Sequence, residues 1–287
     1  MLTVVIPVRG GPELLAEQLE ALAGQSSEEP WEVVVADDSD PGDARVAEVV
    51  ARFEGRLPGL RRVPAGAQGA AHARNVGASA ASGDKLAFLD ADDVAAPGWV
   101  AAMADALDRH AVVASRWEFE RLNSPEVLAG RAPAQVNGPQ RFKRPPFLDH
   151  AGGCGLGVRR AAFEAVGGFD ESWALLEDTD LTWRLQLAGH DLGFAPDAVV
   201  HVRFRSSGLA SFKQAYGFGF HNVRLYKEYL PRGMRRIRPS ESLARLWGLV
   251  RMLPELFSRE TRPRYLRTLG HRLGRLAGSL RYGVWGV

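Results

Sequence analysis

The sequence predicts an α/β protein in which a mostly parallel sheet is flanked by helices and followed by a basic helical appendage. Its 287 residues, 46% hydrophobic and 24% charged, are enough to bury a substantial core. Before residue 203, short β-branched runs alternate with segments of helical periodicity, which is typical of a parallel sheet covered on both faces. After it, leucines recur at helical spacing among arginines.

The elements of the α/β part follow this alternation along the chain. The expected strands cover residues 2–6, 32–36, 60–63, 85–89, 111–119 and 154–158, with further strands near Leu192 and Val199. The expected helices end at Gly24, span 46–53 and 70–81, begin at Pro97, span 161–166 and begin with the acidic residues at 177. Because the carboxyl ends of parallel strands meet at one edge of a sheet, the residues after the first four strands should converge there.

Residues 123–146 break the alternation. They contain five prolines and little periodicity. We expect a long mobile loop near the site, and an inert surface loop fits the pattern equally well.

Charge divides the chain into two parts. Residues 1–202 hold 18 Lys and Arg against 30 Asp and Glu, whereas residues 203–287 hold 18 against four. We therefore predict a catalytic domain at 1–205, suited to metal-dependent chemistry, and a basic extension at 206–287, suited to an anionic partner. No nucleic acid is expected as that partner, because no recognition motif accompanies the charge.

The sequence favours the cytosol. Cys154 is the only cysteine, which excludes an intramolecular disulfide, and no secretory signal is apparent at Met1. Arg245, Arg251 and Glu255 interrupt the most apolar C-terminal stretch, so no segment is expected to span a bilayer.

Three carboxylates, those of Asp90, Asp92 and Asp93, follow the fourth expected strand. Carboxylates this close repel one another unless a cation lies between them. Asp90 and Asp92 are two residues apart and would point the same way from an extended strand end, whereas Asp93 would point aside. Hard oxygen ligands favour Mg²⁺ or Mn²⁺ over zinc, and we expect Cys154 to lie far from the cluster. The alternative is an ordinary acidic turn.

Three further side chains can serve a ligand or only the fold. Asp38 follows the second strand and can accept a hydrogen bond from a nucleobase or ribose hydroxyl, or cap a turn. Arg74, near the start of the 70–81 helix, can face a phosphate or base, or be solvated. His201 ends an apolar run and can complete a two-carboxylate metal site, although a lone histidine there is more often structural.

A second acidic cluster, Glu177, Asp178 and Asp180, opens a helix. Acids in a first turn stabilise the helix dipole, but one is enough for that purpose. A carboxylate held at such a position can instead act as general base on an acceptor hydroxyl.

Six motifs appear in order along residues 1–205. They are VVIPVRG at 4–10, VVVADDSD at 33–40, GAAHARNVG at 69–77, FLDADD at 88–93, GGFDESWALLEDTDLTWRL at 167–185, and His201. Together they resemble a family 2 glycosyltransferase with the GT-A fold. The resemblance implies a nucleotide-sugar donor, with UDP and dTDP both open, and an inverting transfer to a hydroxyl acceptor.

The resemblance also implies roles on the donor side. Pro7 to Arg9 would lie along the nucleotide, Asp38 would bond the base, and Arg74 would contact base or phosphate. Asp90 would hold the ribose or the metal. Many relatives have Tyr-Asn where this chain has Arg9-Gly10-Gly11, which leaves the details of base recognition open.

For the metal and the acceptor, the resemblance implies a second set of roles. Asp92 and His201 would bind Mg²⁺ or Mn²⁺, with Asp93 a poorer substitute for Asp92. Asp178 would be the catalytic base, and Glu177 and Trp173 would orient it or bind the acceptor.

Three other functions fit less well. A non-catalytic sugar-nucleotide or glycan-binding scaffold of the same fold would not need the pairs Glu177-Asp178 and Asp90-Ala91-Asp92. A nucleotidyltransferase would carry a glycine- and lysine-rich phosphate loop, and Arg9-Gly10-Gly11-Pro12 is a poor match. An aspartyl phosphatase would carry its nucleophilic aspartate after the first strand.

Leucine rows at 243–257 and 266–280 predict two amphipathic helices in the basic extension. Their polar faces carry arginines with aromatic residues interleaved: Arg245, Arg251, Arg267, Arg272, Arg275 and Arg281, with Trp247, Tyr265, Tyr282 and Trp285. Such helices can lie on an anionic membrane through 240–287, pack on the acidic domain or form a homo-oligomer. Peripheral contact with the cytoplasmic face would suit a lipid-linked or glycan acceptor, as in cell-envelope polysaccharide or glycolipid synthesis.

Overall fold

The computed structural model describes residues 1–128, 131, 133–143, 145–204 and 208–286, and its chain divides into two compact units. The sheet unit comprises Met1–Arg121, Ala134–Gln140 and Asp149–Arg203. The helical unit comprises Leu122–Pro133, Arg141–Leu148 and Phe204–Val287. The predicted boundary at 205 lies outside the described residues. Segments 122–133 and 141–148, which that prediction assigns to the first domain, are part of the helical unit.

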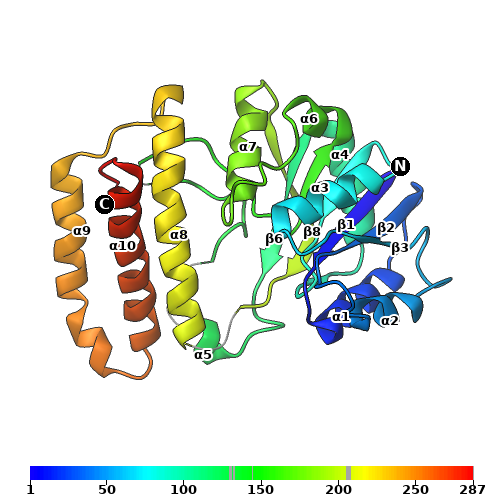
Figure 1. Cartoon of the computed structure of the whole chain (residues 1–287), viewed down its shortest axis with the longest axis horizontal. Coiled ribbons are helices and arrows are strands. Elements are labelled where there is room, and N and C mark those ends of the chain that lie inside the picture. Colours follow the sequence, from blue (N-terminus) through cyan, green and yellow to red (C-terminus); the bar gives the residue numbers. More distant parts are fainter. Residues whose placement is uncertain (129–130, 132, 144, 205–207, 287) are drawn as a thin grey trace. The chain divides into compact units, whose positions relative to one another are not determined.

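The strands lie close to where the sequence predicts them, except β5, which the sequence analysis did not predict. They are β1 Leu2–Val8, β2 Trp31–Asp37, β3 Arg61–Pro64, β4 Lys85–Phe88, β5 Val94–Ala95, β6 Val112–Glu118, β7 Leu156–Arg159 and β8 Leu192–His201. Within the described residues they form one sheet in the order β3-β2-β1-β4-β7-β6-β8-β5 (Figure 1). The strands expected near Leu192 and Val199 are a single strand, β8.

Most neighbouring strands in this sheet are parallel. The pairs β1–β2, β1–β4, β2–β3 and β6–β8 are parallel, which confirms the predicted sheet. β7 runs antiparallel to β4 and β6, and β5 runs antiparallel to β8. As a result, residues that precede β7 and residues that follow β4 lie at the same edge of the sheet.

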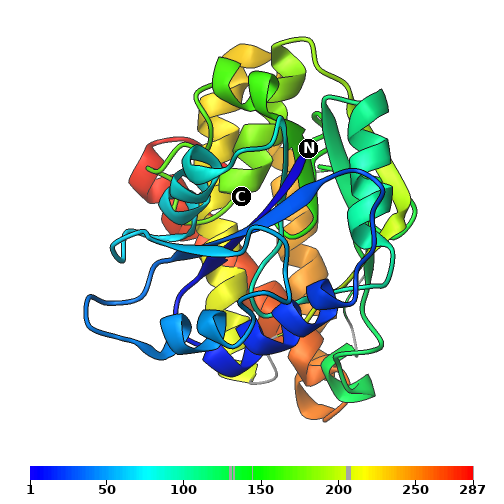
Figure 2. The ribbon, with the colours of Figure 1, turned by 90° about the vertical axis from the view of Figure 1, so that its right-hand side faces the viewer.

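Helices cover both faces of the sheet. They are α1 Pro12–Ala23, α2 Arg45–Ala51, α3 Ala70–Ala80, α4 Trp99–Arg109, α6 Arg160–Ala165 and α7 Glu177–Leu187. α3, α6 and α7 share one buried core with strand residues such as Val5, Phe88 and Leu156. Figures 1 and 2 show α3 on one side of β1 to β3, and α1 and α2 on the other.

The helix expected after Pro97 is α4, and its periodic residues are fully buried: Trp99, Val100, Met103 and Leu107. It packs against the sheet at Gly157, where an added Cβ would lie 2.4 Å from Met103 Sδ. Leu156 and Val158, on either side of this glycine, belong to the core that includes α3, α6 and α7. Because side chains alternate along β7, Gly157 faces α4 on one side of the sheet, whereas Leu156 and Val158 face the core on the other side.

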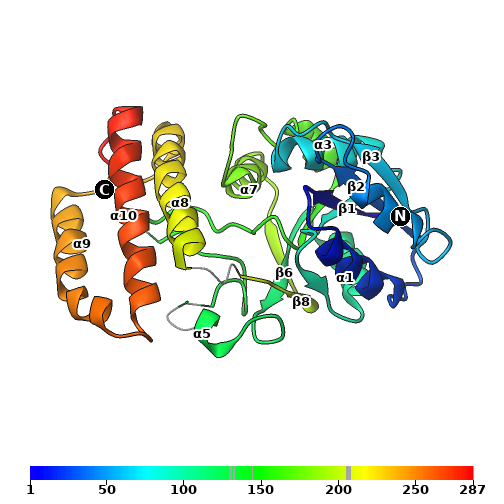
Figure 3. The same cartoon turned by 60° about the horizontal axis from the view of Figure 1, so that its bottom comes forward.

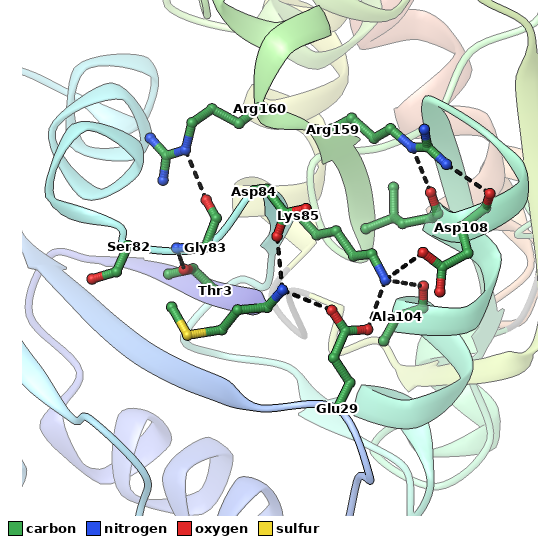
Figure 4. Close-up of polar contacts among 12 residues, drawn as sticks. Thr3, Glu29, Ser82, Gly83, Asp84, Lys85, Ala104, Asp108, Arg159 and Arg160 are labelled. Carbon is green, nitrogen blue, oxygen red and sulfur yellow. Dashed lines mark hydrogen bonds and ion pairs between the residues drawn. The ribbon is translucent and has the colours of Figure 1, made fainter.

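Charged groups are balanced at the amino end of β4 (Figure 4). The buried Lys85 Nζ lies 2.6 Å from Glu29 Oε2 and 2.7 Å from Asp108 Oδ1, and it donates to the Ala104 carbonyl oxygen. Burial alone would lower the pKa of Lys85, but these carboxylates outweigh burial and raise it. This edge of the sheet carries a buried cation whose charge is matched by its neighbours.

Part of the predicted 123–146 loop is held against the sheet. Gln135 is buried, with its Nε2 donating to the Ser115 carbonyl oxygen at 2.9 Å and its Oε1 accepting from the Gly152 backbone N–H at 2.9 Å. The loop also contains a short helix, α5 Pro125–Leu128. Residues 129–130, 132 and 144 of this loop lie outside the described residues.

The helical unit is built around a helix that the sequence analysis did not predict, α8 Gly208–Tyr229. The predicted leucine rows lie on α9 Pro239–Arg251, followed by a 3₁₀ turn at Leu253–Phe257, and on α10 Arg262–Tyr282. A second 3₁₀ turn, Leu230–Arg232, follows α8. Figures 1 and 3 both place α10 between α8 and α9.

Glycines decide which face of α10 is buried. Gly270, Gly274 and Gly278 recur every four residues, and a Cβ added at Gly274 would lie 2.0 Å from the Tyr216 carbonyl oxygen. Because this glycine face packs directly on α8, the leucine row of α10 is left on the surface, where Leu280 is 81% exposed. No helix among the described residues is both long and apolar enough to cross a bilayer.

The arrangement of arginines and leucines in the helical unit contradicts part of the sequence analysis. Arg245 and Arg275, expected on exposed polar faces, are buried, whereas the leucines of the same helices are largely exposed. Arg251 and Arg281 are exposed as expected, so the helical period located the faces but did not show which of their arginines neighbouring elements would cover.

Candidate active site

The two acidic clusters of the sequence meet at the side chain of Arg74. Arg74 lies in the second turn of α3, and its Nη2 donates to Asp90 Oδ1 at 2.7 Å while its Nη1 donates to Glu177 Oε1 at 2.6 Å. Its guanidinium also lies 5.5 Å from the ring centroid of Phe169. One buried guanidinium thus joins the residues after β4 to the first turn of α7.

The electrostatics of this junction favour further positive charge. Burial raises the pKa of Glu177 even though Arg74 opposes the shift, and Asp178 raises it further. Burial also raises the pKa of Asp178. Burial alone would lower the pKa of Arg74. The carboxylates of Asp90 and Glu177 outweigh burial and raise the pKa, so Arg74 stays charged. One guanidinium faces several carboxylates, so the site has an excess of negative charge.

Backbone groups hold Asp178 in place. Its Oδ2 accepts from the Gly153 N–H at 2.7 Å, and its Oδ1 accepts from the Thr179 N–H at 2.6 Å. Gly153 must be small, because an added Cβ would lie 2.8 Å from Arg74 Nη2. The carboxylate is therefore fixed at the helix start and half-buried.

Strained backbone precedes this carboxylate. Leu176, immediately before α7, has φ 67°, a left-handed conformation that costs a branched residue of its kind about 1 kcal/mol or more. Ala67, with φ 59°, lies just before the loop residues that bind Asp38. Strain of this kind persists where the surrounding structure imposes it, and here it flanks the predicted site residues.

The residues after β4 form a cluster that includes Cys154. Ligand atoms of Asp90, Asp93 and Cys154 all lie within 4.8 Å of one another. The expectation that Cys154 lies far from the carboxylates is therefore wrong. The cause is the antiparallel pairing of β7 with β4, in which the Gly155 N–H donates to the Phe88 carbonyl oxygen at 2.7 Å and brings Cys154 beside Asp90.

Asp93 and Asp92 differ in their surroundings. Asp93 is buried and accepts from the Arg203 N–H at 2.6 Å, and burial followed by repulsion from Asp90 and Asp92 raises its pKa well above the usual range. Asp92 is exposed. A bound cation would relieve the repulsion that raises the pKa of Asp93, and Asp92 is the more accessible of the two, so Asp92 as the metal ligand stays a prediction.

His201 lies at the carboxyl end of β8, opposite Val94 of β5, which follows Asp93 in the sequence. Its Nδ1 lies 2.5 Å from Glu118 Oε2, and its Nε2 is 3.4 Å from Arg121 Nη1. A carboxylate on one ring nitrogen is the usual partner of a histidine that binds a metal through the other. Glu118, which the sequence analysis missed, is thus a candidate for the residue that orients His201.

The oxygen atoms of the Asp90–Asp93–Cys154 cluster, but not its thiol, are of the type that a hard divalent ion prefers. Burial, then repulsion from Asp93 and Asp90, raises the pKa of the Cys154 thiol well above its usual range, so the thiol stays protonated and is unsuited to Mg²⁺ or Mn²⁺. The predicted ligands Asp92 and His201 are outside the Asp90–Asp93–Cys154 cluster. They provide an exposed carboxylate and an imidazole already oriented by Glu118.

Asp38 holds a loop rather than pointing freely outward. Its Oδ1 accepts from the Gln68 N–H at 2.7 Å and its Oδ2 from the Gly69 N–H at 3.0 Å, directly before α3. Arg62 pairs with the neighbouring Asp37 at 2.7 Å. Each carboxylate oxygen has a second lone pair, so contact between Asp38 and a base stays a prediction.

The remaining predicted residues lie in different environments. Pro7 is the penultimate residue of β1 and pairs with Ala36 of β2, and Arg9 is exposed, 3.8 Å from Asp40. Trp173 is 4% exposed, so its ring is packed inside the sheet unit, and orienting neighbours suits it better than direct contact with an acceptor.

Gly153 and Arg203 are two further residues that the sequence analysis missed. Gly152-Gly153, directly before an expected strand, was an available signal, since paired glycines there indicate close approach of another group. No sequence signal pointed to Arg203, because its contacts with Asp93 and the Asp92 carbonyl oxygen join residues more than 100 positions apart.

Comparison with known proteins agrees with this geometry. Residues 3–167 match the family model described as glycosyl transferase family 2, and residues 136–258 match one described as glycosyl transferase family group 2. The chain is 30% identical over 204 residues to the pre-mycofactocin glycosyltransferase of Mycobacterium tuberculosis, covering 69% of this chain and 42% of that protein. It is 26% identical over 217 residues to the O-antigen biosynthesis protein RfbC of Myxococcus xanthus, covering 74% and 16%. The chain thus spans less than half the length of these relatives.

Solved structures show the same fold. The mannosyltransferase PcManGT from Pyrobaculum calidifontis, in complex with GDP-Man and Mn²⁺, matches with a TM-score of 0.66 and 19% identity, covering 96% of this chain and 86% of that one. S. aureus TarS 1–349 in complex with UDP-GlcNAc matches with a TM-score of 0.54 and 16% identity, covering 99% and 92%. The predicted GT-A fold is confirmed, and the chain belongs to glycosyl transferase family 2.

Proposed function

We propose that the protein transfers a sugar, with inversion, from a UDP- or dTDP-sugar to a hydroxyl of a glycan or lipid-linked acceptor. The observation that carries the proposal is the bridge made by Arg74, which links Asp90 and Glu177 through hydrogen bonds of 2.7 and 2.6 Å. It links Asp90, predicted for the donor, to Glu177, the neighbour in sequence of the predicted base Asp178. Family membership and the nucleotide sugars named for PcManGT and TarS support the reaction class.

The chemistry assigned to this chain's residues is a single displacement. Asp178 removes the proton from the acceptor hydroxyl, whose oxygen forms a bond to the anomeric carbon as the bond to the donor diphosphate breaks. Arg74 holds Asp90 and Glu177, and the Gly153 and Thr179 N–H groups hold Asp178. General-base assistance of this kind contributes roughly a hundred- to ten-thousand-fold in rate.

We assign the divalent ion to Asp92 and His201, with Asp90 on the ribose or the ion and Glu118 orienting His201. When bound, Mg²⁺ or Mn²⁺ would stabilise the charge that develops on the leaving diphosphate. On the donor side, Pro7, Arg9 and Asp38 would contact the nucleoside, and Arg74 would act through Asp90.

We further propose that the protein works at the cytoplasmic face of a membrane, with residues 240–287 in contact with an anionic surface. The support is the exposed apolar row of α9, where Leu243 is 69% exposed and Trp247 57%, beside the excess of arginine in the helical unit. A lipid-linked acceptor, as used in cell-envelope polysaccharide or glycolipid synthesis, would then be presented at that surface.

The test separates catalysis from donor binding. Wild type, Asp178→Asn, Asp92→Ala and the control Asp197→Asn, at an exposed residue of β8, are incubated with Mn²⁺ and a panel of UDP-, dTDP- and GDP-sugars. Nucleotide release and thermal shift are measured. We expect Asp178→Asn to keep the donor-induced shift and lose at least a hundredfold in turnover, Asp92→Ala to lose the Mn²⁺-dependent shift, and Asp197→Asn to match wild type. Normal turnover by Asp178→Asn would remove the base assignment, and donor binding without any turnover by wild type would favour the non-catalytic scaffold.

A further inference from the structure

The helical unit contains a cavity of about 520 Å³ between α9 and α10, in which four cationic side chains lie among largely apolar walls. Lys143, Arg235, Arg245 and Arg272 line it, and Arg245 is only 8% exposed. Among the described residues that line this cavity, Glu241 is the one acid, and it is paired with Arg235 at 2.7 Å. The cavity therefore keeps a surplus of positive charge and has a volume typical of small-ligand sites.

A second cavity, of about 320 Å³, lies on the α8 side of α10 and shares Arg272 with the first. It also contains Arg131 and Arg267, and no carboxylate occurs among its described lining residues. Arg131 is held in position there, because its Nη2 donates to Ser211 Oγ at 3.2 Å and its guanidinium stacks 4.1 Å from the Phe204 ring centroid. Arg272 thus connects two pockets that both attract anions.

Burial and mutual repulsion lower the pKa values of the basic side chains around the two cavities. Burial and repulsion from Arg267 lower the pKa of Arg131 to about 10. Burial, followed by repulsion from Arg245 and Arg272, lowers the pKa of Arg275 to about 9. The same three arginines add to burial in lowering the pKa of His271 to about 3. An anion bound among them would relieve this repulsion.

Exposed apolar residues continue from the first cavity to the surface. On α9, Leu249 lines the cavity, and Leu246, three residues earlier on the adjoining face, is 47% exposed. On α10, Arg272 lines the cavity, and Leu276, one turn later, is 44% exposed. A ligand that fits has a phosphate at one end and a hydrocarbon chain at the other.

We propose that the α9–α10 cavity binds the phosphate head group of a lipid monophosphate, with Arg245, Arg272 and Lys143 as its ligands and the exposed leucines of α9 and α10 against its chain. Bidentate arginine suits a phosphate monoester, which carries more charge than a phosphodiester. The proposal refines the membrane contact inferred above into recognition of one class of head group. It does not depend on the sugar-transfer chemistry.

Vesicle binding by the full-length protein tests this inference. Phosphatidylcholine vesicles are doped with phosphatidate, a monoester, or with phosphatidylglycerol, a diester, at matched surface charge. Sedimentation is measured without donor or acceptor, and the part of the tryptophan fluorescence change that is lost in Trp247→Phe reports insertion of α9. We expect wild type to bind phosphatidate vesicles about tenfold more tightly, which is the effect of one additional charge-assisted hydrogen bond.

Matched variants identify the cavity as the source of that preference. Arg272→Gln should abolish it, and Lys143→Gln, at an exposed lining residue that folding should not require, should reduce it. Arg281→Gln removes the same charge from an exposed position on α10 and should weaken binding to both vesicles while the preference remains. Asp178→Asn should bind as wild type does, so a failed catalytic proposal would leave this result intact.

Several outcomes would overturn the inference. Equal binding of wild type to both kinds of vesicle would show that the contact depends on non-specific charge attraction. Equal loss of preference in Arg281→Gln and Arg272→Gln would show that the cavity is not the source of the preference. If inorganic phosphate raises the Tm of wild type and Arg281→Gln but not of Arg272→Gln, and no vesicle binds, the cavity serves a free anion. Concentration-dependent dimers that bury Trp247, again without vesicle binding, would assign the apolar row to a second copy of the chain.

Discussion

The site around Arg74 and the α9–α10 cavity are electrostatic opposites. In the sheet unit one guanidinium serves several carboxylates, and burial raises the pKa of Glu177 and Asp178. In the helical unit burial, followed by repulsion from Arg245 and Arg272, lowers the pKa of Arg275 to about 9. The amino end of β4, where Lys85 is matched by Glu29 and Asp108, shows that the chain can balance a buried charge.

The difference indicates what each region is suited to bind. Excess buried charge destabilises a fold unless a ligand of opposite sign neutralises it. A surplus of carboxylates fits a divalent cation, and a surplus of arginines fits a phosphate. The two regions should therefore respond in opposite directions when one arginine is removed.

Removal of Arg74 should have the largest effect. Arg74→Gln leaves Asp90, Glu177 and Asp178 without their shared cation, which we expect to cost about 3 kcal/mol of unfolding free energy, near the lower end for a broken buried pair because Asp90 is partly exposed. Urea unfolding measures the change, and added Mn²⁺ should recover part of it. Arg56→Gln, which breaks the exposed pair with Glu20, is the control and should change stability little. Equal effects of the two substitutions would contradict the bridging role of Arg74.

The next effect is the pH dependence of the helical unit. The pKa of His271 is about 3 in the folded protein and near 6.5 when unfolded, so the unfolded chain binds more protons as pH falls below 6.5. Between pH 6.5 and 5 this histidine alone should cost roughly 2 kcal/mol of stability. His271→Gln should remove that part of the pH dependence in thermal unfolding, and His190→Gln should not. Identical pH profiles for His271→Gln and wild type would refute the assignment.

A smaller change is expected at the metal site. Glu118→Gln keeps a hydrogen-bond acceptor for His201 Nδ1 but loses the charge, and we expect Mn²⁺ affinity to fall about 10- to 100-fold. Calorimetric titration with Mn²⁺ and UDP measures it, with the exposed Glu120→Gln as control. Unchanged affinity in Glu118→Gln would leave His201 a structural residue.

The smallest effect, and the one of opposite sign, is expected in the helical unit. Arg272→Gln removes one of three mutually repelling charges, so stability should stay level or rise by about 1 kcal/mol. Urea unfolding in phosphate-free buffer measures it beside Arg74→Gln. A loss of stability as large as that of Arg74→Gln would show that neighbouring groups balance the charge of these arginines. The two regions would then not be electrostatic opposites.

Much of the sheet unit could be predicted from local patterns. β-branched runs located the strands, and strand ends located Asp38 and Asp90, because parallel strands place their carboxyl ends at one edge. The likeness of six ordered motifs supplied the predicted roles of Asp178 and His201. Local patterns could not supply Glu118 or the nearness of Cys154, since both depend on how β6, β7 and β8 are ordered in the sheet.

The helical unit was harder to predict for a related reason. Its leucine spacing indicated two helices, but α8, with glycine and aromatic residues spread along it, has no comparable leucine row. Periodicity identifies the faces of a helix and does not say which of them another helix will cover. The contacts of Gly219 and Gly274 with opposing backbone made the glycine faces the buried ones and turned the leucines outward.

The sequence by itself determined the fold class, the family and the acidic residues at the strand ends, because these depend on local periodicity and on short motifs. The tertiary structure alone decided that Arg74 joins the two acidic clusters, that β7 returns Cys154 to Asp90, and that arginines rather than leucines are enclosed between α8, α9 and α10. Each of these depends on contacts between residues far apart in the chain, where the closest packing of backbones and the matching of buried charge prevail over local pattern.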